Sequence, residues 1–190
     1  MTIRCCALLL LALCACNERP SPGQQRADAL VREPAAPNNG FYTPEGVQRV
    51  FEDIRSRAGA DASLLELELL PDRATVQVQP SGRAGHVEQY EWRQDGVQGP
   101  VAVELRGKGK LEQNLFPLSA LDLSGIVELV SVATERVDPD NGRVRRVLVR
   151  RGLPADDAIC VRVYVDSPLR SGHVDADARG KLVEPATTKR

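Results

Sequence analysis

The strongest constraint on the fold is the stretch "LLELELLPDRATVQVQ", residues 64–79, in which apolar and polar residues alternate on both sides of a Pro-Asp turn. Because successive side chains of a β-strand point to opposite faces, this period of two predicts an antiparallel hairpin with one apolar face. A register that pairs Leu69 with Ala74 also pairs Leu65 with Val78. It places six apolar side chains on one face: Leu65, Leu67, Leu69, Ala74, Val76 and Val78.

A helix just before this hairpin supplies a cover for that face. Thr43 is a good N-cap, Pro44 suits the first turn, and Gly59 can end the helix. Apolar residues recur at helical spacing and form one stripe: Val47, Val50, Phe51, Ile54 and Ala58. A third strand is expected from His86 and a fourth over residues 97–105, joined by a tight turn near Asp95 and Gly96.

The second half of the chain repeats this order. A helical stripe contains Ile126, Val130, Ala133 and Val137. Strands are expected over residues 144–153, 158–167 and 172–178, with a fourth starting at Leu182. The sequence therefore predicts an α+β fold of two tandem units, residues 41–107 and 111–186, each with one helix packed on a four-stranded antiparallel sheet.

The two histidines of the chain, His86 and His173, each lie in a Gly-His-Val run, and these runs coincide when Val76 and Val78 are aligned with Val163 and Val165. We expect the histidines to be copies at equivalent strand positions, not partners in one site.

The N-terminus, "MTIRCCALLLLALCAC", has one early cation, Arg4, and an apolar run from Cys5 to Ala15. That run is shorter than the ~20 residues of a spanning helix and has the length of a signal-peptide core. The stretch "LCAC" resembles the bacterial lipobox, which implies a signal peptide over residues 1–15 and a lipid anchor at Cys16. The alternative is an ordinary secretory signal peptide cut near Ala15. By the same resemblance, Asn17 implies the periplasmic side of the outer membrane of a Gram-negative cell.

Residues 16–40 are expected to hold the lipidated cysteine and a flexible tether, because they are rich in Pro, Gln, Ala, Arg and Asn without an apolar period. Cleavage before Cys16 would leave Cys160 as the one free thiol, so no internal disulfide is expected. The formal net charge is −1, which argues against a general attraction to nucleic acid.

The order of a helix and an antiparallel meander that ends in "GHVDADARGKLVEP" resembles the PepSY domain. Two such units in tandem are similar to the β-lactamase inhibitor protein fold, in which the helices back the sheets and an open sheet face binds the partner. The resemblance implies an extracytoplasmic binding or inhibitory module and no reaction.

Two kinds of chemistry are weighed against that interpretation. A metal site would combine the histidines with Glu88 and Asp175, but the chain has no HExxH, CxxC or Asp-rich calcium loop, and we expect no metal or cofactor. A thiol enzyme would need a base beside Cys160. Pairing Val165 with Gly172 puts His173 opposite Tyr164, about 13 Å along the strands from the thiol, and the facing carboxylate would be Asp177. We therefore expect no catalytic residues.

A partner-binding sheet face is the favoured function. Counting alternation from an inward Val87 turns Glu88, Tyr90 and Trp92 outward in the first unit. In the second unit the outward set is Arg146, Leu148, Arg150, Cys160, Arg162 and Tyr164. Tyrosine, tryptophan and arginine are the usual anchors of interfaces. We therefore expect a periplasmic protein or peptide to be bound by seven residues of these faces: Glu88, Tyr90, Trp92, Arg146, Arg150, Arg162 and Tyr164. The alternatives are a structural envelope protein that associates with itself or with cell-wall components and, more distantly, a small thiol enzyme that uses Cys160.

Replacing the lipobox cysteine tests the anchor. We expect Cys16→Ser to abolish acylation and to release the protein from the membrane fraction, because the hydroxyl does not replace the thiol as acyl acceptor. Metabolic labelling with a fatty acid, followed by fractionation, measures both effects. Continued labelling of the variant would contradict the lipobox interpretation.

Overall fold

The computed structural model describes residues 40–106, 109–153 and 156–183. The expected signal peptide, Cys16 and the tether, apart from its last residue Gly40, lie outside these residues. Among the described helices, none is long and apolar enough to cross a membrane.

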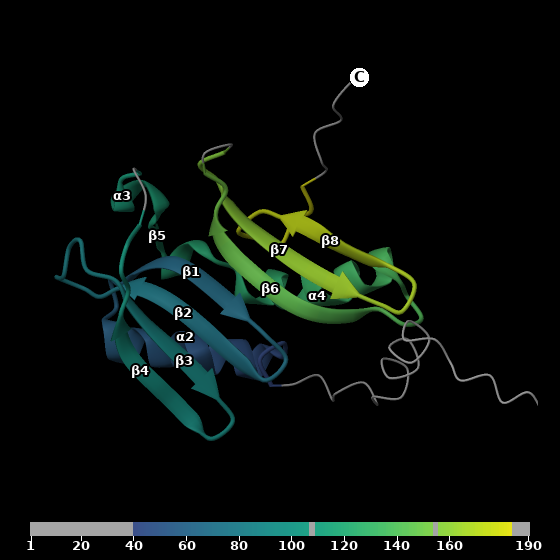
Figure 1. Ribbon diagram of the computed structural model, residues 1–190, viewed down its shortest axis with the longest axis horizontal. Helices are drawn as coiled ribbons and strands as arrows, with labels where there is room; N and C mark the ends of the chain where they lie inside the picture. Colours follow the sequence, from purple (N-terminus) through teal and green to yellow (C-terminus); the bar gives the residue numbers. More distant parts are fainter. Residues whose placement is uncertain (1–39, 107–108, 154–155, 184–190) are drawn as a thin grey trace, which may run out of the picture.

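One antiparallel sheet of eight strands forms the centre of the described structure, and two 15-residue helices lie on one of its faces (Figure 1). The strand order is β4-β3-β2-β1-β6-β7-β8, and the short β5 pairs with β1. The α+β class is therefore confirmed. The elements, in chain order, are α2 (Pro44–Ala58), β1 (Ser63–Leu69), β2 (Arg73–Gln79), β3 (Glu88–Arg93), β4 (Gly96–Ala102), α3 (Leu111–Asn114), β5 (Phe116–Pro117), the 3-10 helix η1 (Leu118–Ala120), α4 (Leu123–Val137), β6 (Arg143–Arg151), β7 (Ile159–Asp166) and β8 (Ser171–Ala176).

Both long helices begin at side-chain caps. The Thr43 hydroxyl accepts a hydrogen bond from the Gly46 N–H at 3.1 Å, and Gly59 ends α2 with a φ of 96°. Asp122 caps α4 by accepting from the Ser124 N–H at 3.0 Å. The predicted stripe of α2 is buried against the sheet. In α4 the buried residues are Ile126, Leu129 and Ala133, whereas the expected Val130 and Val137 are half-buried.

The β1–β2 hairpin has the predicted register at its turn and a different one further away. Leu69 pairs with Ala74 and Leu67 with Val76, as expected. A bulge between Leu64 and Glu66 then makes Leu64, not Leu65, the partner of Val78. Because a bulge adds one unpaired residue to a strand, it moves the buried position by one. Leu64 is fully buried in the core, and the expectation for Leu65 was wrong.

The two halves are joined through their first strands. β1 and β6 pair antiparallel, with Glu68 opposite Leu148 at the middle of three paired positions. The result is one continuous sheet. Within the described residues the second half has three strands, and the expected fourth is reduced to an isolated bridge between Ala176 and Leu182. The rest of that expected strand, which includes Pro185, lies outside the described residues.

The pairing of the strands also corrects the histidine alignment. Val78 pairs with Glu88, whereas Val165, its counterpart, pairs with Gly172. Glu88 is three residues after Gly85 (88 − 85), so the two Gly-His-Val runs are out of step by that amount. His86 precedes β3, His173 lies within β8, and the predicted equivalence was wrong. Five strand spacings, roughly 24 Å, separate β3 from β8, so the histidines do not share a site.

The predicted outward orientation of Glu88, Tyr90 and Trp92 was also wrong. Each of them pairs with an inward residue of β2, namely Val78, Val76 and Ala74. Since paired residues of neighbouring strands point to the same face, all three turn toward the helices, and their exposed fractions are 7%, 5% and 3%. Val87 is buried as well, but it lies before β3, so alternation counted from it gave the opposite phase.

Trp92 therefore belongs to the core, and its indole N–H donates to Asp53 of α2 at 2.9 Å. We expect Trp92→Ala to lower the free energy of unfolding by about 3–5 kcal/mol, because it leaves a cavity under α2. Chemical denaturation measures the change. Trp92→Phe is the matched control, since it keeps most of the ring and loses chiefly one hydrogen bond, about 1 kcal/mol. An alanine variant as stable as the wild type would show that the ring does not fill the core.

Candidate binding face

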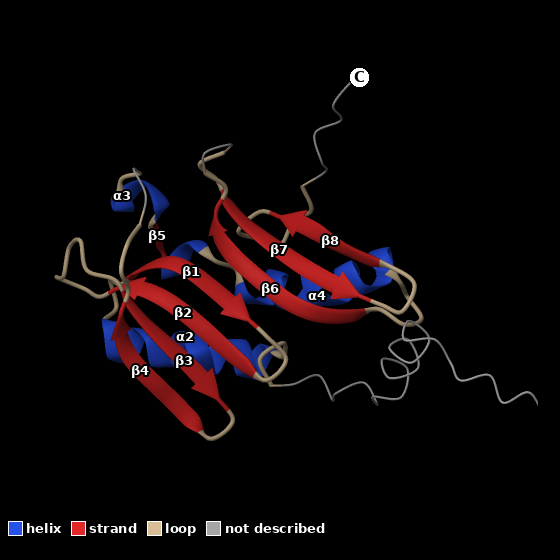
Figure 2. Cartoon of the chain, viewed as in Figure 1, coloured by secondary structure: helices blue, strands red, loops and turns tan. Residues whose placement is uncertain are grey.

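The face of the sheet opposite the helices is open in its second half. We call the open face the outward side chains of β1, β6, β7 and β8: Glu66, Glu68, Arg146, Leu148, Arg150, Cys160, Arg162, Tyr164, His173 and Asp175. No element of the described chain lies over it (Figure 2). Strand pairing confirms the predicted outward set of the second half, because Arg146 lies opposite Tyr164, Leu148 opposite Arg162 and Arg150 opposite Cys160.

A row of contacts crosses this face from β1 to β8. Glu68 accepts a hydrogen bond from the Arg146 guanidinium at 3.2 Å. The Cζ of Arg146 lies 4.3 Å from the centroid of the Tyr164 ring, within the range of a cation–π contact. The Tyr164 ring in turn lies 5.9 Å from the His173 ring, centroid to centroid. Strands far apart in sequence thus hold one ordered polar row.

A second contact fixes Arg162. Its Nε and one terminal nitrogen donate to the two carboxylate oxygens of Asp175 at 2.6 and 2.8 Å. Two parallel bonds of this kind hold both side chains in one geometry. The hydrogen bonds from Arg162 keep the pKa of Asp175 below its usual range, although burial opposes the shift.

The Tyr164 hydroxyl lies between two guanidinium groups. Burial alone would raise the pKa of this phenol, but hydrogen bonds from Arg162 and Arg146 lower it, and the net pKa is below its ordinary value. The guanidinium groups of Arg162 and Arg146 thus lie near the phenol. This arrangement orients the ring and gives the centre of the face positive character.

An apolar centre lies beside this polar row. Leu148 is only 7% exposed although it points away from the core. It lines a hollow of about 120 Å³ together with Arg150, Cys160, Arg162 and Leu153. Arg150 is exposed and has no carboxylate of the described residues within ion-pair distance. Burial raises the pKa of the nearby Glu66, and the charge of Arg150 partly offsets that effect.

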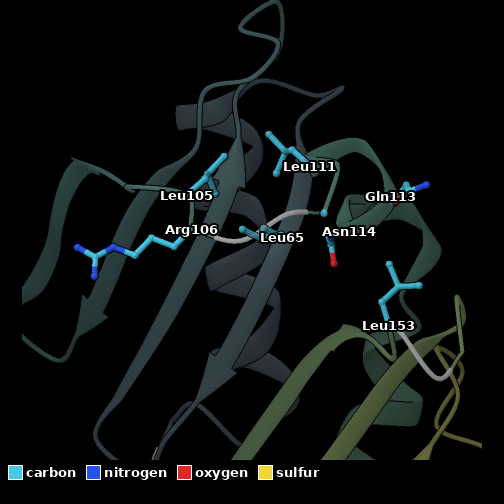
Figure 3. A pocket seen from close by; sticks show the side chains of 8 residues that line it. Leu65, Leu105, Arg106, Leu111, Gln113, Asn114 and Leu153 are labelled. Carbon is cyan, nitrogen blue, oxygen red and sulfur yellow. The ribbon is translucent and has the colours of Figure 1, made fainter.

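A larger hollow of about 520 Å³ lies at the end of β1 (Figure 3). Four leucines from separate segments line it: Leu65, Leu105, Leu111 and Leu153. Leu153 lines both hollows, so they adjoin. Our sequence reasoning missed this feature. Its signal is the pair Leu64-Leu65, where the period of two breaks and one leucine is left outside the core.

The histidines make only local contacts. His86 Nε2 lies 3.3 Å from Glu88, which also accepts hydrogen bonds from Arg83 and, at 2.9 Å, from the Tyr90 hydroxyl. His173 Nε2 lies 4.0 Å from Asp175. In the part of the chain that the structure describes, no three His, Cys, Asp or Glu side chains are grouped as metal ligands.

Cys160 lacks the surroundings of an activated thiol. It lies opposite Arg150, while His173 lies opposite Tyr164, four residues further along β7. That separation is about 13 Å, beyond the reach of a general base. Burial raises the pKa of the thiol, and the charge of Asp175 adds to the shift. The neighbouring carboxylate is thus Asp175, where Asp177 was expected.

No protein-family model, curated protein or solved structure matches this chain. The geometry of the open face is therefore what supports a function.

The raised thiol pKa gives a direct test. A higher pKa leaves less thiolate at a given pH, so we expect Cys160 to be alkylated by iodoacetamide more slowly in the folded chain than in the unfolded chain, with its rate rising at higher pH. Mass spectrometry of the Cys160 peptide measures the rate across pH. Asp175→Asn is the control, because removing that charge should move the midpoint down. A folded midpoint below the unfolded one would favour the thiol-enzyme alternative.

Proposed function

We propose that this chain is a lipid-anchored periplasmic protein that binds a protein or peptide partner through the open face of its second half. The observation that carries the proposal is an ordered but uncovered assembly of Tyr164, Arg146, Arg162 and Leu148. Tyrosine and arginine dominate the energetic centres of protein interfaces.

Order in the unbound protein favours binding through this assembly. Fixing a long side chain on association costs about 0.5–1.5 kcal/mol. Arg146 is held between Glu68 and Tyr164, and Arg162 is held by Asp175. These side chains have already lost much of that freedom, so a partner meets a rigid surface.

The architecture supports a duplicated origin for the two halves. The bulge between Leu64 and Glu66 has a counterpart between Val144 and Arg146, 80 residues later in each case (144 − 64 and 146 − 66). Both helices have 15 residues. These correspondences fit the proposed likeness to tandem PepSY-like units and to the β-lactamase inhibitor protein fold, in which an open sheet face is the binding surface.

The first half contributes differently from what its sequence predicted. Glu88, Tyr90 and Trp92 are buried toward the helices and form no part of the proposed surface. The proposed surface therefore keeps four of the predicted binding residues: Arg146, Arg150, Arg162 and Tyr164. A flexible tether over residues 17–40 would have a reach of roughly 25–30 Å, enough to let this surface face away from a membrane to which Cys16 is anchored.

Crosslinking in the cell tests the proposal. A photo-reactive amino acid at Arg150, which is exposed beside Leu148, should form a defined adduct with a protein or peptide. The same group at Gln98, outward and exposed on β4 of the first half, is the control. Equal adducts from both positions, or an adduct that consists only of a second copy of this chain, would contradict the proposal.

Truncating the central tyrosine gives the quantitative prediction. We expect Tyr164→Ala to weaken binding of the crosslinked partner by at least about 2 kcal/mol, roughly thirtyfold, because it removes the ring that Arg146 stacks on. Gln77→Ala is the matched control, since Gln77 occupies the corresponding outward position on β2 of the first half. Titration of the purified partner measures both, and equal losses in the two variants would argue against a site centred on Tyr164.

A further inference from the structure

The two edges of the sheet differ in how they are protected. β4, at one edge, contains Pro100, which has no N–H to offer to another strand. Proline and coverage by a loop are two common ways to block pairing at an edge. β8, at the other edge, contains no proline, and within residues 40–106, 109–153 and 156–183 only its end is covered, where Leu182 bridges to Ala176.

Hydrogen bonds show which groups of β8 point away from the sheet. The Val183 N–H donates to the Asp175 carbonyl at 2.9 Å, on the side opposite β7. Along a strand, every second residue directs its N–H and C=O to the same side. Ser171 and His173 therefore direct theirs outward too, and no backbone group in the described ranges bonds to them.

The sequence that follows Val183 is poorly suited to complete this edge. Val183 lies beside Asp175, so two residues further on an antiparallel strand would bring residue 185 beside His173. Residue 185 is proline, which cannot donate to the His173 carbonyl. A strand with the sequence of the tail would therefore lack one hydrogen bond to His173 that a strand without proline at this position can make.

The first half shows what normally fills this position. There β4 pairs with β3, placing Val97 opposite Trp92 and Val101 opposite Gln89. In the second half, Leu182 beside Ala176 corresponds to Val97, and the position beside His173, which corresponds to Val101, is vacant among the described residues. The half-buried Val137 of α4 lies against Gly172 there and offers apolar surface to an added strand.

We infer that this edge takes an extended segment of the partner as an added strand, antiparallel to β8 and bonded to the backbone of Ser171 and His173. The inference rests on the proposed function and specifies how the partner is recognised. The guest segment needs an N–H opposite His173 and a small apolar side chain above Val137, with its next side chain beside His173 on the open face.

A second copy of this chain fits the edge less well than a peptide. Two antiparallel β8 strands could pair only over Ser171–Val174, because Val183 already occupies the place beside Asp175 in each copy. Beyond these four residues, the chain of each copy would clash with the segment around Val183 of the other copy. An extended peptide can end there freely.

Two substitutions at one residue test the inference. Peptides are selected from a phage-displayed random library against the full chain, and their affinities are measured for wild type, His173→Pro and His173→Ala. The proline removes an N–H that points away from β7, so the sheet keeps its own bonds. Both variants lose the imidazole and only the proline loses the N–H, so we expect binding to be at least about tenfold weaker in His173→Pro than in His173→Ala.

The outcomes separate this inference from the proposed function. Peptides weakened by Tyr164→Ala but not by His173→Pro would overturn the added strand and leave the open face standing. If no peptide binds, the added strand is overturned, whereas the open face still depends on the outcome of crosslinking at Arg150. Concentration-dependent dimers that protect the Ser171 and His173 amides from exchange would overturn the peptide partner.

A second measurement tests the inference on the wild-type chain, in case His173→Pro does not fold. A selected peptide with N-methyl groups on the residues facing β8 should lose binding to wild type, whereas N-methylation at the alternate residues should not. Equal affinity of the two methylated peptides would overturn the added strand.

Discussion

The antiparallel pairing of β1 with β6 is the interaction on which the rest of the structure depends. It aligns the inward sides of the two halves, so that the helices α2 and α4 contact each other and cover one common core. It also places Glu68 beside Arg146, which are 78 residues apart in sequence. The polar row of the open face therefore begins on one half and ends on the other, and neither half holds it alone.

The sequence predicts elements well where local chemistry decides them. Thr43 and Gly59 mark the ends of α2, and the Pro-Asp turn sets the register of Leu69 with Ala74. It fails where one residue changes the phase. The bulge at Leu65 and the start of β3 at Glu88 each reverse which residues face the core. One extra residue shifts a period of two by half, so inward and outward positions exchange beyond it. Trp92 moved from surface to core in this way.

The candidate site was predictable in its second half for the same reason. From the pair Arg146–Tyr164 to the pair Arg151–Ile159, β6 and β7 pair without a bulge. The valines of these strands show which side is inward. Arg162 and Tyr164 could therefore be placed from alternation. The contact of Arg146 with Glu68 could not, because it crosses the seam between β1 and β6, and no local pattern specifies which strands of two units become neighbours.

The two halves differ in their edges and in their outward faces, and only the second half offers both features to a partner. The first half closes its edge with β4 and Pro100, and its outward face carries mainly glutamine and glutamate at Gln77, Gln89 and Glu91. The second half has three long strands in the part of the chain that the structure describes, and its outward face carries the arginines and Tyr164. Since His173 lies on β8 next to Tyr164, its side chain belongs to the open face while its backbone belongs to the uncovered edge. A segment added at that edge would contact both, which would combine backbone pairing and side-chain recognition in a single surface.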